Sequence, residues 1–260
     1  MCIRDSYGTV VGVGDDSELT VEFYLRPGLS KDEFDSLVGT EQLGRPILGP
    51  FDAADPLANL AVEKQLRWRA QALFWLTQGL VLHLGGHPDL ALEFFDRAEQ
   101  ELREWPDRDG KEILYFFQGR EHFFLSERSG QDTAQQLDEA QRLFEKAVDL
   151  RPDYARARAA LGSLHRRRAQ RIADPAAQLA DPNLGQAIDL QEQALQDARA
   201  AQDPLLEALV ATALAKSYRL RGDVHYALGQ DDEAAMWLDR ALSLVGQATP
   251  VLEEQRAYRV

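Results

Sequence analysis

Histidine spacing is the first feature of the sequence that could indicate chemistry, because imidazole serves as a metal ligand and as an acid or base near neutral pH. His83 and His87 stand four residues apart in HLGGHP, and on a continuous helix this spacing could hold zinc. The two glycines between them and the proline after them indicate a turn between two helices instead. We therefore expect a structural role for the pair. His122 and His165 occupy similar positions in successive helical segments, where packing or solvent exposure is expected.

Other motifs with chemical meaning are incomplete. PDRDGKE places Asp107, Asp109 and Gly110 in half of a calcium-loop pattern, but the later ligands, including the closing Glu, are missing. GTVVGVGDDS lacks the third glycine of a dinucleotide fingerprint, and no phosphate loop occurs. Cys2 is the only cysteine, so no disulfide or thiolate metal site is available. We expect no catalytic residue, cofactor or metal, and hence no enzyme activity within this chain.

Composition restricts the class of protein. The chain has 260 residues, of which 45% are hydrophobic and 28% charged, as in a globular protein. Its formal net charge of −14 disfavours binding to nucleic acid or to an anionic membrane. Its longest apolar stretch, residues 70–84, contains Gln71, Thr77, Gln78 and His83, so membrane insertion is not expected.

The chain changes in character along its length. Residues 7–26 carry β-branched and aromatic residues on both sides of a Gly/Asp/Ser turn, which predicts a β-hairpin. SKDEFDSLV predicts a short helix with Ser30 as its N-cap, and GRPILGPFDAADP is typical of a linker. From about residue 57 every long segment has helical periodicity. We therefore expect a mainly α fold over residues 57–260, preceded by a partial α/β segment over residues 7–56.

Residues 1–6 raise the question of where the native chain begins. MCIRDS resembles the translated mosaic-end sequence of a transposase used to prepare sequencing libraries; the alternative is a native start with the same six residues. A hairpin and one short helix cannot bury a core of their own. We therefore expect residues 1–6 to be a non-native scar, residues 7–56 to be the remnant of a larger α/β domain, and the chain to be a fragment of a bacterial protein.

Repeated helix–turn–helix segments dominate the rest of the chain. The clearest are YRLRGDVHYALGQDDEAAMWLDRAL (218–242), WLTQGLVLHLGGHPDLALEFFDRA (75–98) and LDEAQRLFEKAVDLRPDYARARAALG (137–162). Their small and large apolar positions resemble the tetratricopeptide repeat (TPR), which implies an α-solenoid of about four helical hairpins. Small residues are needed where two helices cross closely, and large ones fill the space opposite. The resemblance gives packing roles to Trp75, Gly79, Ala91, Phe95, Ala98, Gly119, Ala140, Phe144, Ala147, Pro152, Gly162, Ala187, Ala194, Gly222, Ala234 and Ala241.

Two repeats depart from the pattern. SERSGQDTA adds about nine residues within the second repeat, and the third carries the insertion HRRRAQRIADPAAQLADPN. Gln191 stands where a large apolar residue is expected. We expect these departures to lengthen the loops and leave the helical register intact.

The resemblance also implies a function, because TPR proteins bind partners along a concave groove lined by the first helices of the repeats. The corresponding residues here are Leu73, Leu76, Leu80, Ile113, Phe116, Arg120, Arg156, Ser163, Arg166, Arg219 and Asp223. The arginines suggest a protein or peptide partner with acidic and apolar parts, because guanidinium groups pair well with carboxylates. For HRRRAQR the alternative is a solvated helix end. A carboxylate clamp is not expected, because Asn59 and Asn183 are the only asparagines and neither is at a clamp position.

Two other functions stay open from the sequence. The helical region could be the regulatory or sensor module of a larger enzyme or receptor whose N-terminal part is missing, or it could mediate self-association. The compartment is not indicated; the cytoplasm is slightly favoured over the extracytoplasmic part of a membrane-anchored parent.

Overall fold

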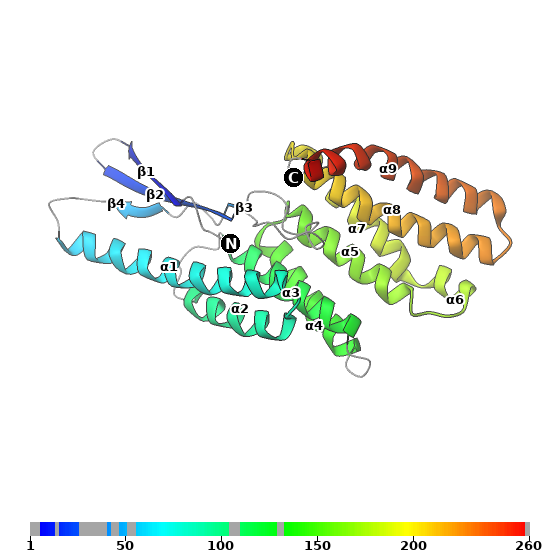
Figure 1. The fold of residues 1–260 in the computed structure, drawn as a ribbon, viewed down its shortest axis with the longest axis horizontal. Helices are drawn as coiled ribbons and strands as arrows, with labels where there is room; N and C mark the ends of the chain where they lie inside the picture. Colours follow the sequence, from blue (N-terminus) through cyan, green and yellow to red (C-terminus); the bar gives the residue numbers. More distant parts are fainter. Residues whose placement is uncertain are drawn as a thin grey trace. The chain divides into compact units, whose positions relative to one another are not determined.

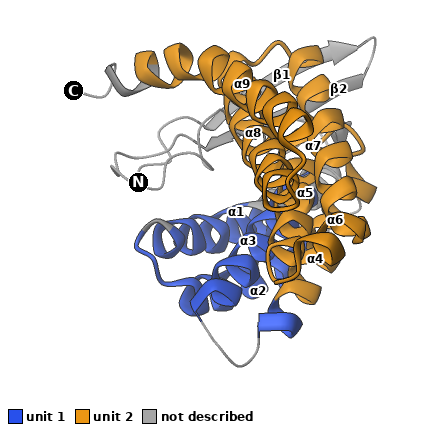
Figure 2. Ribbon diagram, turned by 90° about the vertical axis from the view of Figure 1, so that its right-hand side faces the viewer, with its two compact units in different colours: residues 1–136 blue, residues 137–260 orange. Residues whose placement is uncertain are grey.

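The computed structural model describes residues 6–13, 16–25, 41–42, 47–50, 56–103, 110–128 and 133–257. The chain divides into two compact units, residues 1–136 and residues 137–260 (Figure 2). The strands are β1 (Ser6–Val13), β2 (Asp16–Leu25), β3 (Glu41–Gln42) and β4 (Ile47–Pro50). The helices are α1 (Pro56–Leu84), α2 (Pro88–Leu102), α3 (Lys111–Arg128), α4 (Thr133–Leu150), α5 (Ala155–Ala169), α6 (Pro175–Ala180), α7 (Pro182–Ala200), α8 (Pro204–Ala227) and α9 (Asp231–Ala257).

Of the strands of unit 1, β1 and β2 coincide with the predicted hairpin, whereas β4 lies in the segment that was predicted to be a linker. β1 and β2 pair antiparallel from Ser6 opposite Phe23 to Val13 opposite Asp16, and β3 and β4 also pair with β2. That this segment is the remnant of a larger α/β domain stays a prediction, as do the scar at residues 1–6 and the fragment. The predicted helix at residues 30–38 and the half calcium motif at Asp107 and Asp109 lie outside the described residues.

A helical hairpin follows the strands in unit 1. α1 and α2 pack together and are joined by a turn at Gly85–His87 (Figure 1). Gly86 has a φ of +70°, a left-handed conformation that glycine adopts without a steric penalty. The turn is closed by the amide of His87, which donates to the carbonyl of Leu82 over 2.9 Å. His83 and His87 therefore lie on two sides of a turn, as the sequence predicted, and do not share a helix face.

Unit 2 consists of helices packed against their neighbours in sequence. α5 packs against α7, α7 against α8, and α8 against α9, while the short helix α6 falls in the predicted insertion between α5 and α7. Three of these helices start in the same way. The carboxylates of Asp174, Asp181 and Asp203 each accept hydrogen bonds from backbone amides of the first turn, and a proline follows each aspartate. Such caps satisfy amides that have no partner within the helix.

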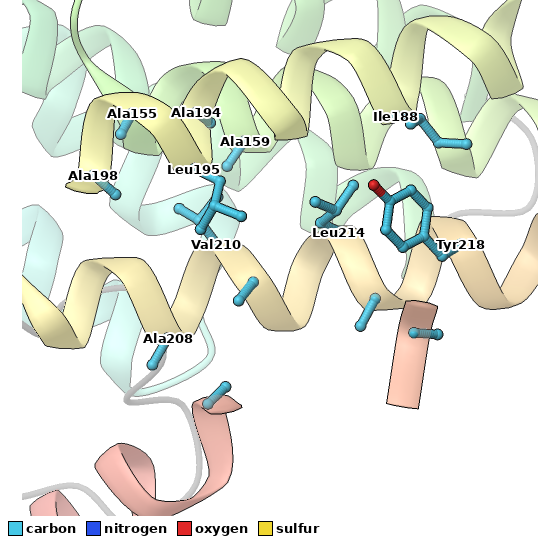
Figure 3. Packing of buried hydrophobic residues seen from close by; sticks show 14 residues of the cluster. Ala155, Ala159, Ile188, Ala194, Leu195, Ala198, Ala208, Val210, Leu214 and Tyr218 are labelled. Carbon is cyan, nitrogen blue, oxygen red and sulfur yellow. The ribbon is translucent and has the colours of Figure 1, made fainter. Parts of the chain in front are cut away.

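Small residues let the helices of unit 2 approach closely. The core cluster is rich in alanine and includes Ala194 and Ala198 of α7 and Ala208 of α8 (Figure 3). Ala211 and Ala215 of α8 belong to it as well. A Cβ atom at Gly162 would lie 2.5 Å from Cγ of Gln191 and 2.9 Å from the carbonyl oxygen of Ala187. At Gly222 it would lie 2.9 Å from Cγ of Leu238.

The residues assigned to packing by the TPR resemblance are largely in the interior. Buried members are Gly79, Ala91, Phe95, Ala98, Gly119, Ala140, Phe144, Ala147, Gly162, Ala187, Ala194, Gly222, Ala234 and Ala241. Two members differ: Trp75 is only half-buried, and Pro152 is exposed in the turn between α4 and α5. Within the described residues, no helix is both long enough and apolar enough to cross a membrane.

Candidate binding surfaces

The apolar part of the predicted groove is buried. Leu76 and Leu80 of α1 are 5% and 0% exposed, and Phe116 of α3 is 4% exposed. Leu73 and Ile113 are buried as well. The expectation that these side chains face a partner is therefore corrected. Their aliphatic and aromatic surface is used for packing, because a helix stabilises itself in water chiefly by burying its apolar face.

Arg120 is the basic residue that the sequence assigned to the groove in unit 1. It is partly buried, and its guanidinium carbon lies 5.7 Å from the ring centroid of Phe116 and 5.2 Å from that of Phe124. Stacking of this kind holds the side chain in place without neutralising its charge.

Helix α5 carries two of the four arginines predicted to bind a partner, Arg156 and Arg166. Its sequence, ARARAALGSLHRRRA, contains five arginines and no acidic residue. Arg158 pairs with Asp197 of α7, and Arg168 pairs with Asp138 of α4 over 2.6 Å. The predicted residues Arg156 and Arg166 are both half-buried. The helix is thus strongly positive within a chain of net charge −14.

The other predicted residues in unit 2 have partners inside the unit. The hydroxyl of Ser163 accepts a hydrogen bond from Nε2 of Gln191 over 3.2 Å. Arg219 and Asp223, 68% and 58% exposed, lie four residues apart on α8, with Nε and Oδ2 3.9 Å apart. An exposed pair of this kind contributes little to stability and stays accessible to a partner.

The unexpected Gln191 is explained by a buried hydrogen-bond network. It is 0% exposed, and its Oε1 accepts a hydrogen bond from the hydroxyl of Ser217 over 2.6 Å. Because Ser163 of α5 and Ser217 of α8 satisfy both ends of the amide, a polar side chain can replace the large apolar residue that the repeat pattern expects.

Sequence reasoning missed a buried hydrogen-bonded pair in unit 1. Nδ1 of His83 is hydrogen-bonded to Oε1 of Glu121 of α3, and both side chains are 1% exposed. The available signal was an acidic residue on the apolar face of residues 111–128, in register with Leu114 and Phe117.

The remaining predicted histidines also make structural contacts. Nδ1 of His122 lies 2.7 Å from Oε1 of Gln136, and Nδ1 of His165 lies 2.7 Å from Oδ1 of Asn183. Among the residues that the structure describes, no group of three or more His, Cys, Asp or Glu residues could hold a metal ion.

No protein-family model matches the chain, and no curated protein matches it in sequence. Similar solved structures include MamA, with 18% identity over 77% of this chain and 90% of that chain and a TM-score of 0.44. A thermophilic TPR protein of Thermus thermophilus, TTC0263, has 15% identity over 72% and 98% of the two chains, with a TM-score of 0.33. YrrB, titled a TPR protein with an unusual peptide-binding site, has 17% identity over 77% and 100%, with a TM-score of 0.35.

These likenesses are distant, and the chain's own geometry shows the type of hairpin. Three helical hairpins place a glycine of the first helix against a large side chain of the second: Gly79 against Phe95, Gly162 against Gln191, and Gly222 against Leu238. With these crossings, the chain is built of TPR-like helical hairpins.

Proposed function

We propose that this chain is a protein-interaction module and that helix α5 contributes the surface that binds an acidic segment of a partner protein. The observation that carries the proposal is the charge of α5, where five arginines occur without an acidic residue. Arginine pairs well with carboxylates because its planar guanidinium donates two parallel hydrogen bonds.

The packing of unit 2 supports this choice over a merely solvated helix end. Arg158 and Arg168 already pair with Asp197 and Asp138, so carboxylates are accommodated along α5 within the unit itself. Leu76, Leu80 and Phe116 are buried and so offer no apolar surface to a partner. The partner is thus defined by its negative charge.

Charge reversal on α5 tests the proposal. The double variant R156E/R166E should bind a fluorescent Asp/Glu-rich peptide at least about tenfold more weakly than the unchanged chain, because two charge-assisted contacts become repulsive. The control is R240E, which makes the same substitution once, and so half the change of charge, on α9 at an exposed residue stacked on Trp237.

Anisotropy titrations at two salt concentrations, with circular dichroism of each variant, give the readout. A partner held by charge should bind more weakly at high salt. Equal affinities for the double variant and R240E, at unchanged helical content, would disprove a role for α5.

A further inference from the structure

Helix α9 exposes apolar side chains beside the face with which it packs. α9 follows α8 and packs against it (Figure 1). On its inner face, Trp237 and Leu244 pack against the core cluster of unit 2. On another face, Leu242 is 68% and Val245 is 44% exposed. A Cβ atom at the adjoining Gly246 would meet no atom of the described residues within 4 Å. This apolar surface of the helix is therefore open.

The exposed apolar residues of α9 belong to a regular pattern. Six residues follow one another at intervals of three and four, and we call them the α9 stripe: Ala235, Leu238, Leu242, Val245, Thr249 and Leu252. Leu238 and Leu252 are half-buried, and the other four are exposed. Residues at these intervals lie along one side of a helix, and a seam of this kind is what packs against a second helix in a coiled coil.

The α9 stripe has the length and the polarity that a helical partner needs. Its residues span about 26 Å along the helix axis, at 1.5 Å a residue. The hydroxyl of Thr249 donates to the carbonyl of Val245 over 2.8 Å, so this hydroxyl has its hydrogen bond within the helix. Covering the stripe would therefore leave no polar side chain of its own without a partner.

Acidic residues follow one edge of the α9 stripe. Asp232, Asp239 and Glu253 are exposed and lie on one line along the helix, at intervals of seven and fourteen residues. Between the first and the last of them the only basic residue is Arg240. Its guanidinium carbon lies 4.8 Å from the ring centroid of Trp237, which belongs to the inner face. The edge of the stripe is therefore negatively charged.

We propose that the α9 stripe binds an amphipathic helix of another protein, which carries an apolar seam and, beside it, lysine or arginine residues that face the acidic edge. Removing apolar surface from water provides affinity, and complementary charges select the partner. A second copy of this chain fits less well, because its own α9 stripe carries the same acidic edge in place of a basic one. The site lies on α9 and its partner is basic, so it is independent of the role proposed for α5.

Binding of a designed peptide to the full chain tests the proposal. The probe is a fluorescein-labelled helical peptide of about 20 residues, with leucine at positions a and d of each heptad and lysine at positions e and g. Fluorescence anisotropy should show saturable binding that weakens at high salt. A control peptide with glutamate in place of every lysine should bind at least about tenfold more weakly, because its charges repel the acidic edge.

A pair of variants locates the apolar part of the binding surface. L242Q/V245Q should weaken binding of the lysine peptide about tenfold or more, because it places polar groups at the centre of the stripe. The matched control is L90Q/V81Q, which makes the same two substitutions in unit 1 at residues that are 46% and 42% exposed. This control should leave the affinity unchanged.

A second pair of variants tests the acidic edge. D239N/E253Q should weaken binding of the lysine peptide about threefold or more, and it should also reduce the dependence on salt. D89N/E93Q removes the same charge from exposed residues of α2 and should leave the affinity unchanged. Circular dichroism of each variant checks that the helical content is preserved.

Four results would overturn the proposal. The first is that the lysine peptide shows no saturable binding, and the second is that the glutamate peptide binds equally well. The third is that L242Q/V245Q and L90Q/V81Q have equal effects. The fourth is a dimer of the unchanged chain, seen by sedimentation, that L242Q/V245Q abolishes, because the occupant of the stripe would then be a second copy.

Discussion

The two units solve the same packing problem with different interiors. Unit 1 fills its core with large side chains such as Phe95 and Phe117, and it buries a titratable pair, His83 and Glu121, beside a cavity. Unit 2 fills the cluster around α7 and α8 largely with alanine, and the amide of Gln191 is satisfied by two serines. These hairpins thus accommodate buried polar groups in two ways. In unit 2 both ends of the Gln191 amide are hydrogen-bonded, whereas in unit 1 only one ring nitrogen of His83 has a hydrogen-bond partner among the described residues.

Breaking the pair in unit 1 should have the largest effect. Glu121→Leu should lower the free energy of unfolding of unit 1 by about 3 kcal/mol or more, because it leaves a buried imidazole without a partner. Native-state hydrogen exchange measures this unit by unit, since it reports local opening at each amide. Glu93→Leu is the control on the exposed face of α2.

A second substitution decides whether the unpaired polar group is the cause. The double variant His83→Leu/Glu121→Leu should regain most of the loss, because replacing both partners by apolar residues removes the need for a hydrogen bond. A double variant that is no more stable than Glu121→Leu alone would show that the shape of the side chains, and not the unpaired imidazole, determines the cost.

Replacing one partner in the Gln191 network of unit 2 should lower the free energy of unfolding by less than breaking the pair in unit 1. Gln191→Leu should cost about 2 kcal/mol, because it leaves the buried hydroxyl of Ser217 unpaired. Adding Ser217→Ala should recover about half of this loss or more, which a double-mutant cycle by urea unfolding would reveal. Additive losses would contradict the coupling of the two side chains.

The smallest expected effect concerns helix crossing. Gly162→Ala should cost about 1 to 2 kcal/mol, because its methyl group would meet Gln191 and the backbone of Ala187. Gly246→Ala is the matched control in α9: nothing lies within 4 Å of its Cβ position, so it should stabilise the helix by about 0.5 to 1 kcal/mol. Midpoints of thermal unfolding that shift in the same direction for both variants would contradict the close packing of α5 against α7 at Gly162.

The helical hairpins could be predicted from the sequence because their signals are local. Periodicity indicated helices from about residue 57, and α1 begins at Pro56. The glycines at the turns, Gly86 and Gly229, both adopt positive φ, the conformation for which glycine is suited. Such features depend on residues a few positions apart and need no knowledge of the partner helix.

The surfaces could not be predicted in the same way because they depend on distant residues. His83 and Glu121 are 38 positions apart, and Gln191 meets Ser163 and Ser217 at separations of 28 and 26. Nor does periodicity tell which side of an apolar helix is covered, so Leu76 and Leu80 were predicted to face a partner when they are in fact buried. The TPR pattern assigns positions within a repeat, but the neighbouring helices determine exposure.

The capped insertion around α6 has a consequence for how this chain can evolve. The segment begins at Asp174, whose side chain accepts from the amide of Ala177, and the side chain of Gln178 donates to the carbonyl of Ala169 at the end of α5 over 2.9 Å. Because its ends are tied down locally, the extra length costs little, and the entropy of closing a loop grows only slowly with its length. Natural insertions and deletions should therefore accumulate between the two helices of a hairpin. The positions of Gly162 within α5 and Gln191 within α7 should stay fixed, because these residues meet where the helices cross.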